Sequence, residues 1–281
     1  MTLQSTFKKQ FSCEFSAPKS EEASAKLLAA HDRLATLKPE YFSVTYGAGG
    51  STKDGTKQAV LDIRAKGADV APHLSFGGDS ADKIEALLDE YKSADVTRVV
   101  ALRGDMPSGT GGSVNLTYAN ELVEFIRQKT GDHFHIEVAA YPEVHPDSRS
   151  VESDLNFFKA KVDAGADSAI TQYFYNGAAY FNFIDACEKK GISIPIVPGI
   201  MPISNFQTLI RFSDMCGADI PRWIRKNLEY YQDDKESLKS FGHNVVQQLC
   251  EDLLTGGAPG LHFYTLNQTK PTIKLWNNLG L

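Results

Sequence analysis

The sequence predicts an α/β fold, a single (β/α)8 TIM barrel over residues 1–281 with extra helices between its seventh and eighth strands. Short β-like runs alternate with amphipathic helical stretches, and eight such units fit the roughly 250 residues of a typical barrel of this kind. No Pro/Gly/Ser-rich linker divides the chain into domains. An open doubly wound sheet is the main alternative, although "GAGGST" (47–52) lacks the third glycine of a dinucleotide fingerprint.

The eight expected strands are short runs rich in β-branched and aromatic residues. They cover residues 11–17, 42–47, 70–76, 97–104, 134–141, 168–175, 194–200 and 260–266. Between them apolar residues recur with helical spacing, as at Ile84, Leu88 and Tyr91, which gives one stripe to pack against a sheet. The longer segment 219–254 precedes the last strand and has the pattern of two or more helices.

The composition is that of an ordinary globular protein and argues against several classes of function. The chain has 42% hydrophobic and 23% charged residues, and its formal net charge of −6 argues against binding nucleic acid. No apolar run approaches the ~18 residues of a membrane span, and the N-terminal stretch has no signal-peptide core. The four cysteines lie far apart, a pattern that favours reduced thiols and a cytoplasmic protein.

Polar side chains gather where the expected strands end. In a barrel the carboxyl ends of all strands meet at one mouth, where the active sites of this fold lie. The residues at these positions are Glu14, Thr45, Tyr46, His73, Asp105, Tyr141, Glu143, His145, Gln172, Tyr173, Tyr264, Thr265 and Asn267. Chance would scatter such groups over both ends of a barrel, so we expect them to form one site.

Two carboxylates of this set are candidates for catalysis. Glu14 lies between Cys13 and Phe15, and burial there would raise its pKa and suit it to donate a proton. A solvated edge position is the alternative for Glu14. Asp105 follows the fourth expected strand and either acts at the mouth or caps the turn in "DMPSG". The tripeptide Arg-Gly-Asp could also be an adhesion motif, but the cysteine pattern argues against an extracellular protein.

Histidines offer a metal site as a further alternative. The spacing in "HFH" (133–135) resembles a pair of ligands, but this segment starts the fifth expected strand, at the wrong end of a barrel for a catalytic metal. His145 could bind a metal together with Glu143 or Asp147, yet no second cluster of ligands accompanies it. We therefore expect no metal.

The segments at the expected strands and their ends form a set with a family resemblance. They are "FSCEFSAPKS", "FSVTYGAGGSTKDGT", "APHLSF", "ALRGDMP", "EVAAYPEVHPDS", "ITQYFY", "PGIMPISNF" and "HFYTLN". In this order they resemble the bacterial methylenetetrahydrofolate reductases, from about residue 9 to residue 280. The resemblance implies a (β/α)8 barrel that binds FAD non-covalently at its mouth, in agreement with the periodicity.

The resemblance implies a ping-pong reaction between small molecules, without nucleic acid or membrane. NADH or NADPH gives a hydride to N5 of FAD, and methylenetetrahydrofolate then takes it to become 5-methyltetrahydrofolate, which supplies methyl groups for methionine synthesis. The folate ring must first open to an iminium cation, for which Glu14 would supply the proton and Asp105 the stabilising charge. Members of the family form homo-oligomers, so we expect one here.

The resemblance also assigns binding residues. Those for FAD are Thr45, His73, Leu102, Arg103, Gly104, Asp105, Tyr118, Ala119, Tyr141, His145, Asp154 and Lys161. Arg103 and Lys161 would meet its phosphates, and the small Gly104 would let the backbone approach the flavin ring. Gln172 would bind the folate pterin, and Phe212 would stack on nicotinamide or on the folate.

Two substrate-binding positions depart from the family pattern. Gln268 follows "YTLN" where the family has an arginine, with Lys270 two residues later. Thr208, beside Gln207, stands where the family has a glutamine. Both concern the folate tail and the nucleotide, and the choice between NADH and NADPH stays open. The chain ends soon after the last expected helix, so the adenosylmethionine-binding domain of eukaryotic relatives is not expected.

Two other enzyme classes stay open. Another FAD-dependent TIM-barrel oxidoreductase, such as a proline dehydrogenase, would explain the two departures by a different substrate. A metal-dependent barrel hydrolase would use His133, His135 or His145. A flavin spectrum would exclude the hydrolase, and reoxidation by methylenetetrahydrofolate would separate the two flavoproteins.

Overall fold

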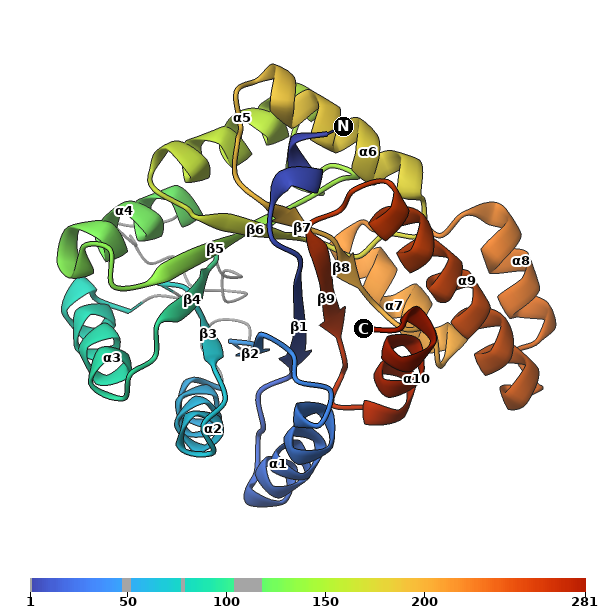
Figure 1. Cartoon of the computed structure of the whole chain (residues 1–281), viewed down its shortest axis with the longest axis horizontal. Helices are drawn as coiled ribbons and strands as arrows, with labels where there is room; N and C mark the ends of the chain where they lie inside the picture. Colours follow the sequence, from blue (N-terminus) through green and yellow to red (C-terminus); the bar gives the residue numbers. More distant parts are fainter. Residues whose placement is uncertain (1, 47–51, 77–78, 104–117) are drawn as a thin grey trace.

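The computed structural model describes residues 2–46, 52–76, 79–103 and 118–281. A parallel sheet curls into a barrel, and the helices surround it (Figure 1). The strands are β1 (Gln10–Phe15), β2 (Tyr41–Val44), β3 (Val70–Leu74), β4 (Arg98–Ala101), β5 (His135–Ala140), β6 (Ser168–Thr171), β7 (Ile196–Val197), β8 (Gly199–Ile200) and β9 (Gly260–Tyr264). The helices are η1 (Leu3–Thr6), α1 (Glu21–Ala35), α2 (Lys53–Ala65), α3 (Ala81–Ser93), α4 (Ala119–Thr130), α5 (Val151–Asp163), α6 (Gly177–Lys189), α7 (Phe206–Cys216), α8 (Arg222–Tyr230), α9 (Lys235–Thr255) and α10 (Thr269–Leu279).

The predicted TIM barrel is confirmed, with its seventh strand in two pieces. The strand order is β7-β6-β5-β4-β3-β2-β1-β9-β8, and every pair is parallel. β7 and β8 are separated by Pro198 alone; β7 pairs with β6 and β8 pairs with β9. Proline has no N–H to donate, but the carbonyl of Pro198 accepts from His262 N at 3.0 Å. The two pieces therefore act as one strand that closes the ring.

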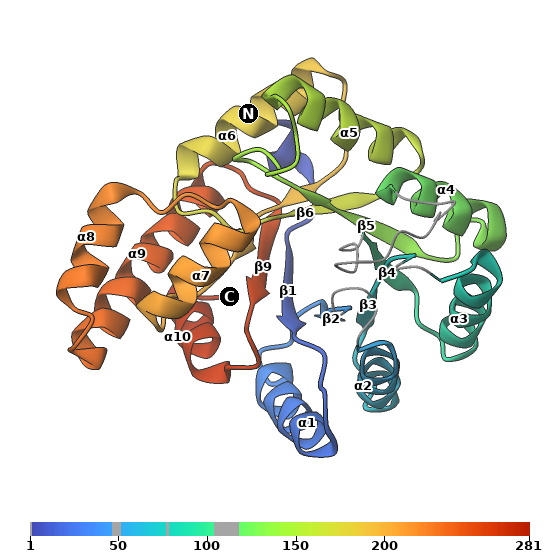
Figure 2. The ribbon, with the colours of Figure 1, turned by 180° about the vertical axis from the view of Figure 1, so that it is seen from behind.

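The extra helices before the last strand are also confirmed. α8 lies within the expected segment 219–254, α9 extends one residue beyond it, and both lie with α7 on one side of the barrel (Figures 1 and 2). Local capping starts two of them. The side chain of Asn205 accepts from a backbone N–H in the first turn of α7, and Asp234 accepts from two in α9. α7 ends at Gly217, whose φ of 73° suits a residue without Cβ.

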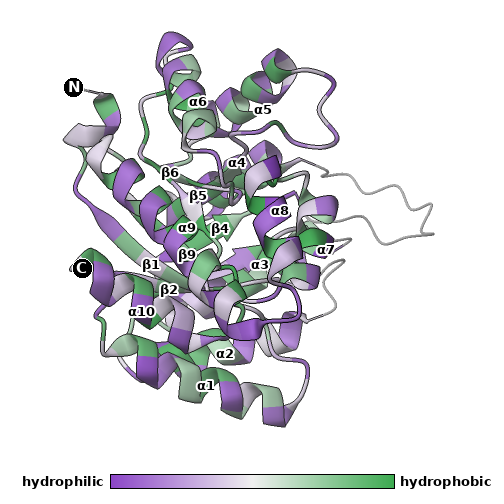
Figure 3. Cartoon of the chain, turned by 90° about the vertical axis from the view of Figure 1, so that its right-hand side faces the viewer, coloured by the Kyte–Doolittle hydropathy of each residue, from purple (hydrophilic) through white to green (hydrophobic). Residues whose placement is uncertain are grey.

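The apolar core lies mainly between the strands and the outer helices. Figure 3 shows hydrophilic and hydrophobic residues alternating along helices such as α9 and α10, as expected when one face packs on the barrel. Inside the barrel the apolar cluster is small, with Tyr41, Ala71, Val100 and Ile170. Buried polar side chains share this interior: Ser12, Ser43, His73, Glu137 and His262. Polar groups in such a place need hydrogen-bond partners, and these partners position the site.

Two further predictions from the sequence concern the cysteines and the possibility of membrane-spanning helices. All four cysteines are free thiols, with Cys13, Cys187 and Cys250 buried and Cys216 half-buried. Among the helices of the described residues, none is long and apolar enough to cross a membrane.

Candidate functional site

Glu14 meets two histidines at the carboxyl end of the barrel. Its Oε2 lies 3.2 Å from Nε2 of His73 and 3.4 Å from Nε2 of His262. Glu14, His73 and His262 come from β1, β3 and β9, which are far apart in the sequence. All three side chains are nearly buried, since the exposed fraction is 14% for Glu14, 10% for His73 and 0% for His262. A carboxylate and two imidazoles so close together can hold and exchange protons.

The loop after β9 holds the backbone of Glu14 in place. The Thr265 hydroxyl donates to the Glu14 carbonyl at 2.6 Å, and Thr265 N donates to the same oxygen at 3.3 Å. Asn267 accepts from Ser16 N at 2.8 Å and donates to Ser16 O at 3.0 Å. Asn267 has a φ of 58°, in the left-handed region that asparagine tolerates better than most residues. Thr265 and Asn267, expected at the mouth, thus hold the end of β1.

The expected raised pKa of Glu14 is wrong. Burial by itself raises the pKa of this carboxyl, but the charge of His73 and the hydrogen bond from His262 outweigh burial and lower the pKa to about 2. The apolar neighbours Cys13 and Phe15 suggested burial alone, because they are the residues next to Glu14 in the sequence. At neutral pH Glu14 is therefore ionised.

This pKa predicts an acid-dependent loss of stability. The pKa of Glu14 is about 2 in the folded chain, against 4.5 for a free glutamate side chain, so its contribution to stability is complete above pH 4.5 and is lost as pH falls toward 2. Between about pH 5 and pH 3 the unfolding free energy of the wild type should fall more steeply than that of Glu14→Gln, by about 1 kcal/mol per pH unit. Urea unfolding at several pH values measures both slopes. Equal slopes would mean that the two histidines do not hold the carboxylate ionised.

A cavity of about 660 Å³ opens at the same end of the barrel, over β4 and β5. Its walls are Tyr46, Ser75, Ala101, Leu102, Arg103, Tyr118, Ala119, Asn120, Ala139, Tyr141, His145, Asp147, Ser148, Arg149, Ser153, Asp154, Phe157 and Lys161. Eight residues predicted to bind FAD are among them: Leu102, Arg103, Tyr118, Ala119, Tyr141, His145, Asp154 and Lys161. The structure thus brings most of the predicted cofactor residues to one cavity, whose volume suits a small-molecule ligand.

The cations Arg103, Arg149 and Lys161 line this cavity together with a pair of aromatic rings. Lys161 donates to the carbonyl of Ala139, and burial lowers the pKa of its ammonium to about 8, against the opposing charge of Asp154. Arg103 Nη2 lies 2.6 Å from Oδ2 of Asp147. The charges of Arg103 and Lys161 favour anionic groups such as phosphates.

The aromatic pair lies at the rim of the cavity. The rings of Tyr118 and Phe157 are stacked with their centroids 6.2 Å apart and an interplanar angle of 12°. Both side chains are about half exposed, at 49% and 54%. Exposed stacked rings offer a flat face to a planar ligand.

The remaining predicted residues lie elsewhere. Thr45 accepts from a backbone N–H after β1, and the Gln172 side chain accepts from the next backbone N–H at 3.0 Å. Thr208 and Phe212 are on α7, where the Phe212 ring lies 5.3 Å from the guanidinium carbon of Arg211. Gln268 is the exposed N-cap residue of α10. His73 contacts Glu14, as above, and Gly104 and Asp105 lie outside the described residues.

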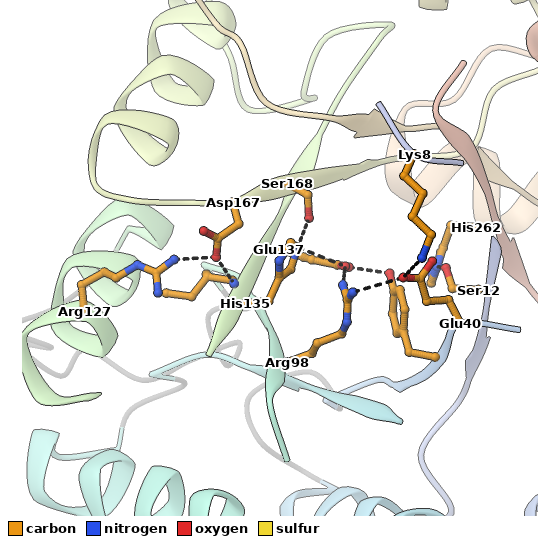
Figure 4. A network of polar contacts seen from close by, with 12 residues as sticks. Lys8, Ser12, Glu40, Arg98, Arg127, His135, Glu137, Asp167, Ser168 and His262 are labelled. Atoms are coloured by element: carbon orange, nitrogen blue, oxygen red, sulfur yellow. Dashed lines mark hydrogen bonds and ion pairs between the residues drawn. The ribbon is translucent and has the colours of Figure 1, made fainter. Parts of the chain in front are cut away.

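His262 and Ser12, both labelled in Figure 4, were not among the residues predicted from the sequence. Ser12 Oγ lies 2.7 Å from Nδ1 of His262, on the side of the ring opposite Glu14. Alternation along a strand could have found both, because each precedes an expected mouth residue, Glu14 or Tyr264, by two positions. Side chains with this spacing point into the same barrel interior.

The histidines considered for a metal have other partners. Nε2 of His133 is 3.0 Å from the carbonyl of Val96, and Nε2 of His135 is 2.7 Å from Oγ of Ser168. Within the part of the chain that the structure describes, no group of three or more His, Cys, Asp or Glu side chains is arranged to hold a metal ion.

Known proteins are similar to this chain in sequence and in fold. The family model described as methylenetetrahydrofolate reductase matches residues 2–280. The 5,10-methylenetetrahydrofolate reductase of Escherichia coli (strain K12) is 38% identical over 271 residues, which are 96% of this chain and 90% of that protein. Methylenetetrahydrofolate reductase (NADH) 1 of Arabidopsis thaliana is 39% identical over 96% of this chain and 48% of its own. An uncharacterized protein from Clostridium thermocellum that binds two copies of 5-methyl-5,6,7,8-tetrahydrofolic acid shares the fold, with a TM-score of 0.68 at 17% identity and coverage of 99% and 97%.

Proposed function

Since the chain belongs to the methylenetetrahydrofolate reductase family, we propose that it reduces 5,10-methylenetetrahydrofolate to 5-methyltetrahydrofolate by a ping-pong reaction through FAD, with NADH or NADPH as the reductant. The observation that carries the proposal is the Glu14 cluster at the same end of the barrel as a cavity lined by the cations Arg103, Arg149 and Lys161. The first can supply a proton and the second can hold a dinucleotide. The product would supply methyl groups for methionine synthesis. That the protein forms a homo-oligomer stays a prediction.

The chemistry of the cavity fits FAD. Arg103 and Lys161 would pair with the two phosphates, and the stacked rings of Tyr118 and Phe157 offer a face to a planar ring. We propose the full set predicted from the sequence as FAD ligands: Thr45, His73, Leu102, Arg103, Gly104, Asp105, Tyr118, Ala119, Tyr141, His145, Asp154 and Lys161. Bound FAD would supply a carrier that accepts a hydride from the nucleotide and gives it to the folate.

In the folate reaction the protein itself would supply a proton. Opening of the five-membered folate ring leaves an iminium cation and needs a proton on a folate nitrogen. We propose that Glu14 passes this proton on from the histidines, because the carboxylate itself is ionised. Asp105 would stabilise the cation by its negative charge. Gln172, Thr208, Phe212 and Gln268 are proposed as substrate-binding residues.

A spectrum and two half-reactions test the function. The purified protein should be yellow, or it should become yellow when FAD is added. In the absence of oxygen, NADH or NADPH should then bleach the flavin. Methylenetetrahydrofolate should restore the colour. Running both nucleotides in parallel decides which one is preferred. A colourless protein that FAD cannot reconstitute contradicts the proposal, and so does a reduced flavin that the folate leaves unchanged.

Lys161→Met is expected to weaken FAD binding. The variant keeps the length of the side chain but removes a charge that would face a phosphate, so the Kd should rise about tenfold to hundredfold. The affinity of the wild type should itself fall as pH rises through about 8, where the buried ammonium loses its proton. Titration of the apoprotein with FAD, followed by flavin fluorescence, measures both effects.

Lys159→Met is the matched control. Lys159 is on the same helix, α5, and pairs with Asp163 one turn later. It is not among the residues that line the cavity. Its loss should leave the Kd for FAD and the pH dependence as they are. Equal effects of the two variants would assign the loss to the net charge of the protein instead of to the cavity.

A further inference from the structure

The loop between β5 and α5, residues 141–150, contacts two parts of the candidate site. On one side Tyr141 and His145 of this loop line the cavity. Between them in the sequence lies Glu143, whose Oε2 accepts a hydrogen bond from the backbone N–H of Asp219 at 2.9 Å. Asp219 lies in the short connection between α7 and α8, 76 residues further along the chain. The residue expected at the mouth of the barrel therefore joins the cavity loop to the end of α7.

A second contact between the loop and α7 lies nearby. Gly217 ends α7, and a Cβ on this residue would lie only 2.7 Å from Cγ of Pro146. The two segments are thus packed so closely that position 217 has no room for a side chain. The loop meets the C-terminal end of α7 at two points, one polar and one apolar.

Hydrogen bonds hold the backbone of the loop on both sides of Val144. Val144 has a φ of 71°, a conformation that β-branched residues rarely adopt. Its own N–H donates to the carbonyl of Tyr141 at 3.3 Å, and the N–H of His145 donates to Oδ2 of Asp154 at 3.1 Å. The N–H of Ser148 donates to the carbonyl of His145 at 2.9 Å. An unfavourable conformation persists only where its surroundings fix it, so this loop is a stiff connection between the cavity and α7.

We propose that Glu143 is a positioning residue that ties α7 to the loop of the cavity. The inference rests on the proposed function, because α7 carries Thr208 and Phe212, which are proposed to bind the substrates. When the cavity is filled, contacts with its ligand hold the loop from the cavity side. Through the bond from Glu143 to Asp219, the end of α7 is then held as well.

The chemistry of Glu143 suggests two informative substitutions. Burial raises the pKa of its carboxyl, the N–H of Asp219 lowers it, and the charge of the Asp219 carboxylate raises it. Glu143→Gln keeps an oxygen that accepts from the N–H and removes the repulsion between the two carboxylates. Glu143→Met keeps the length of the side chain but has no oxygen to accept the bond. If Glu143→Met does not fold, Glu143→Ala replaces it.

Hydrogen exchange of backbone amides tests the connection directly. In the protein loaded with FAD, the Asp219 N–H should exchange about tenfold faster in Glu143→Met than in the wild type, because a hydrogen bond to a charged group is lost. Glu143→Gln should restore the slow rate. Adding FAD to the wild-type apoprotein should slow exchange at Asp219 and in the last turn of α7. In Glu143→Met, which should still bind FAD, these rates should not respond.

Steady-state kinetics test the consequence for the substrate. The KM for methylenetetrahydrofolate should rise about threefold to tenfold in Glu143→Met, with kcat nearly unchanged, as expected when a binding helix is less firmly held. Glu143→Gln should keep the KM of the wild type. A general loss of folded protein would lower the apparent kcat and leave the KM as it is.

Glu188→Met is the matched control. Glu188 is on α6, and its Oε1 accepts from the backbone N–H of Leu3 at 3.0 Å, so it too joins two segments that are far apart in the sequence. It does not line the cavity. Its substitution should speed exchange of the Leu3 N–H and leave both the exchange of Asp219 and the KM for the folate as they are.

The two measurements separate the inference from the function. Equal exchange of the Asp219 N–H in Glu143→Met and the wild type overturns the inference, and so does a faster exchange with an unchanged KM. If exchange at Asp219 depends on Glu143 and on FAD in a protein that cannot reduce the folate, the tie between loop and helix stands and the proposed function is removed.

Discussion

In the Glu14→Gln variant NADH should still reduce the flavin at nearly the wild-type rate. The rate of methylenetetrahydrofolate reduction should fall by about two to four powers of ten. Glutamine keeps the size of the side chain, but it can neither take a proton from His73 or His262 nor pass one on. In the proposed reaction only the folate half-reaction needs that proton. Stopped-flow absorbance of the flavin follows both half-reactions in one preparation.

Glu40→Gln is the control for the loss of a negative charge. Glu40 directly precedes β2, at the amino end of the barrel, and its Oε1 lies 3.4 Å from Lys8 and 3.8 Å from Arg98. Both half-reactions should keep their wild-type rates in this variant. If Glu14→Gln slows the two half-reactions equally, Glu14 supports the structure of the site and does not transfer the proton.

Gly260→Ala should cost about 3 kcal/mol of stability or more, the largest effect expected from adding a methyl group to any glycine that the structure describes. Gly260 opens β9 and pairs with Gln10 of β1. A Cβ at position 260 would lie 1.7 Å from the carbonyl oxygen of Gln10, which is backbone and cannot turn away. The φ of 142° is also one that residues with a Cβ rarely adopt. The β1–β9 pair that carries Glu14 and His262 would have to separate.

Gly67→Ala separates the cost of a left-handed backbone conformation from the cost of a steric clash. Gly67 has a φ of 86°, but a Cβ there would have open space around it. Its substitution should cost only about 1 kcal/mol, the penalty of a left-handed backbone for a residue with a Cβ. Urea unfolding followed by circular dichroism compares the two variants with the wild type. Equal losses would show that the approach of β1 to β9 has room for a methyl group.

The sequence alone predicted the barrel, because its evidence is local. Alternation of β-like runs with stripes such as Ile84, Leu88 and Tyr91 is a property of neighbouring residues, and it survives in the structure as β4 following α3. A site at the carboxyl end of the barrel was predicted for the same reason. Once the strands are parallel, the residues after each one must meet at a common end, and Leu102 and Tyr141, which follow β4 and β5, do line one cavity.

Only the tertiary structure decided the chemistry at Glu14. Its neighbours in the sequence predicted burial and a raised pKa, but the pKa depends on His73 and His262, which other strands bring within 3.2 and 3.4 Å. Electrostatic interactions depend on distance in space, and no local pattern encodes the distance between β1, β3 and β9. For the same reason the contact between His262 and Ser12 became visible only when the barrel closed.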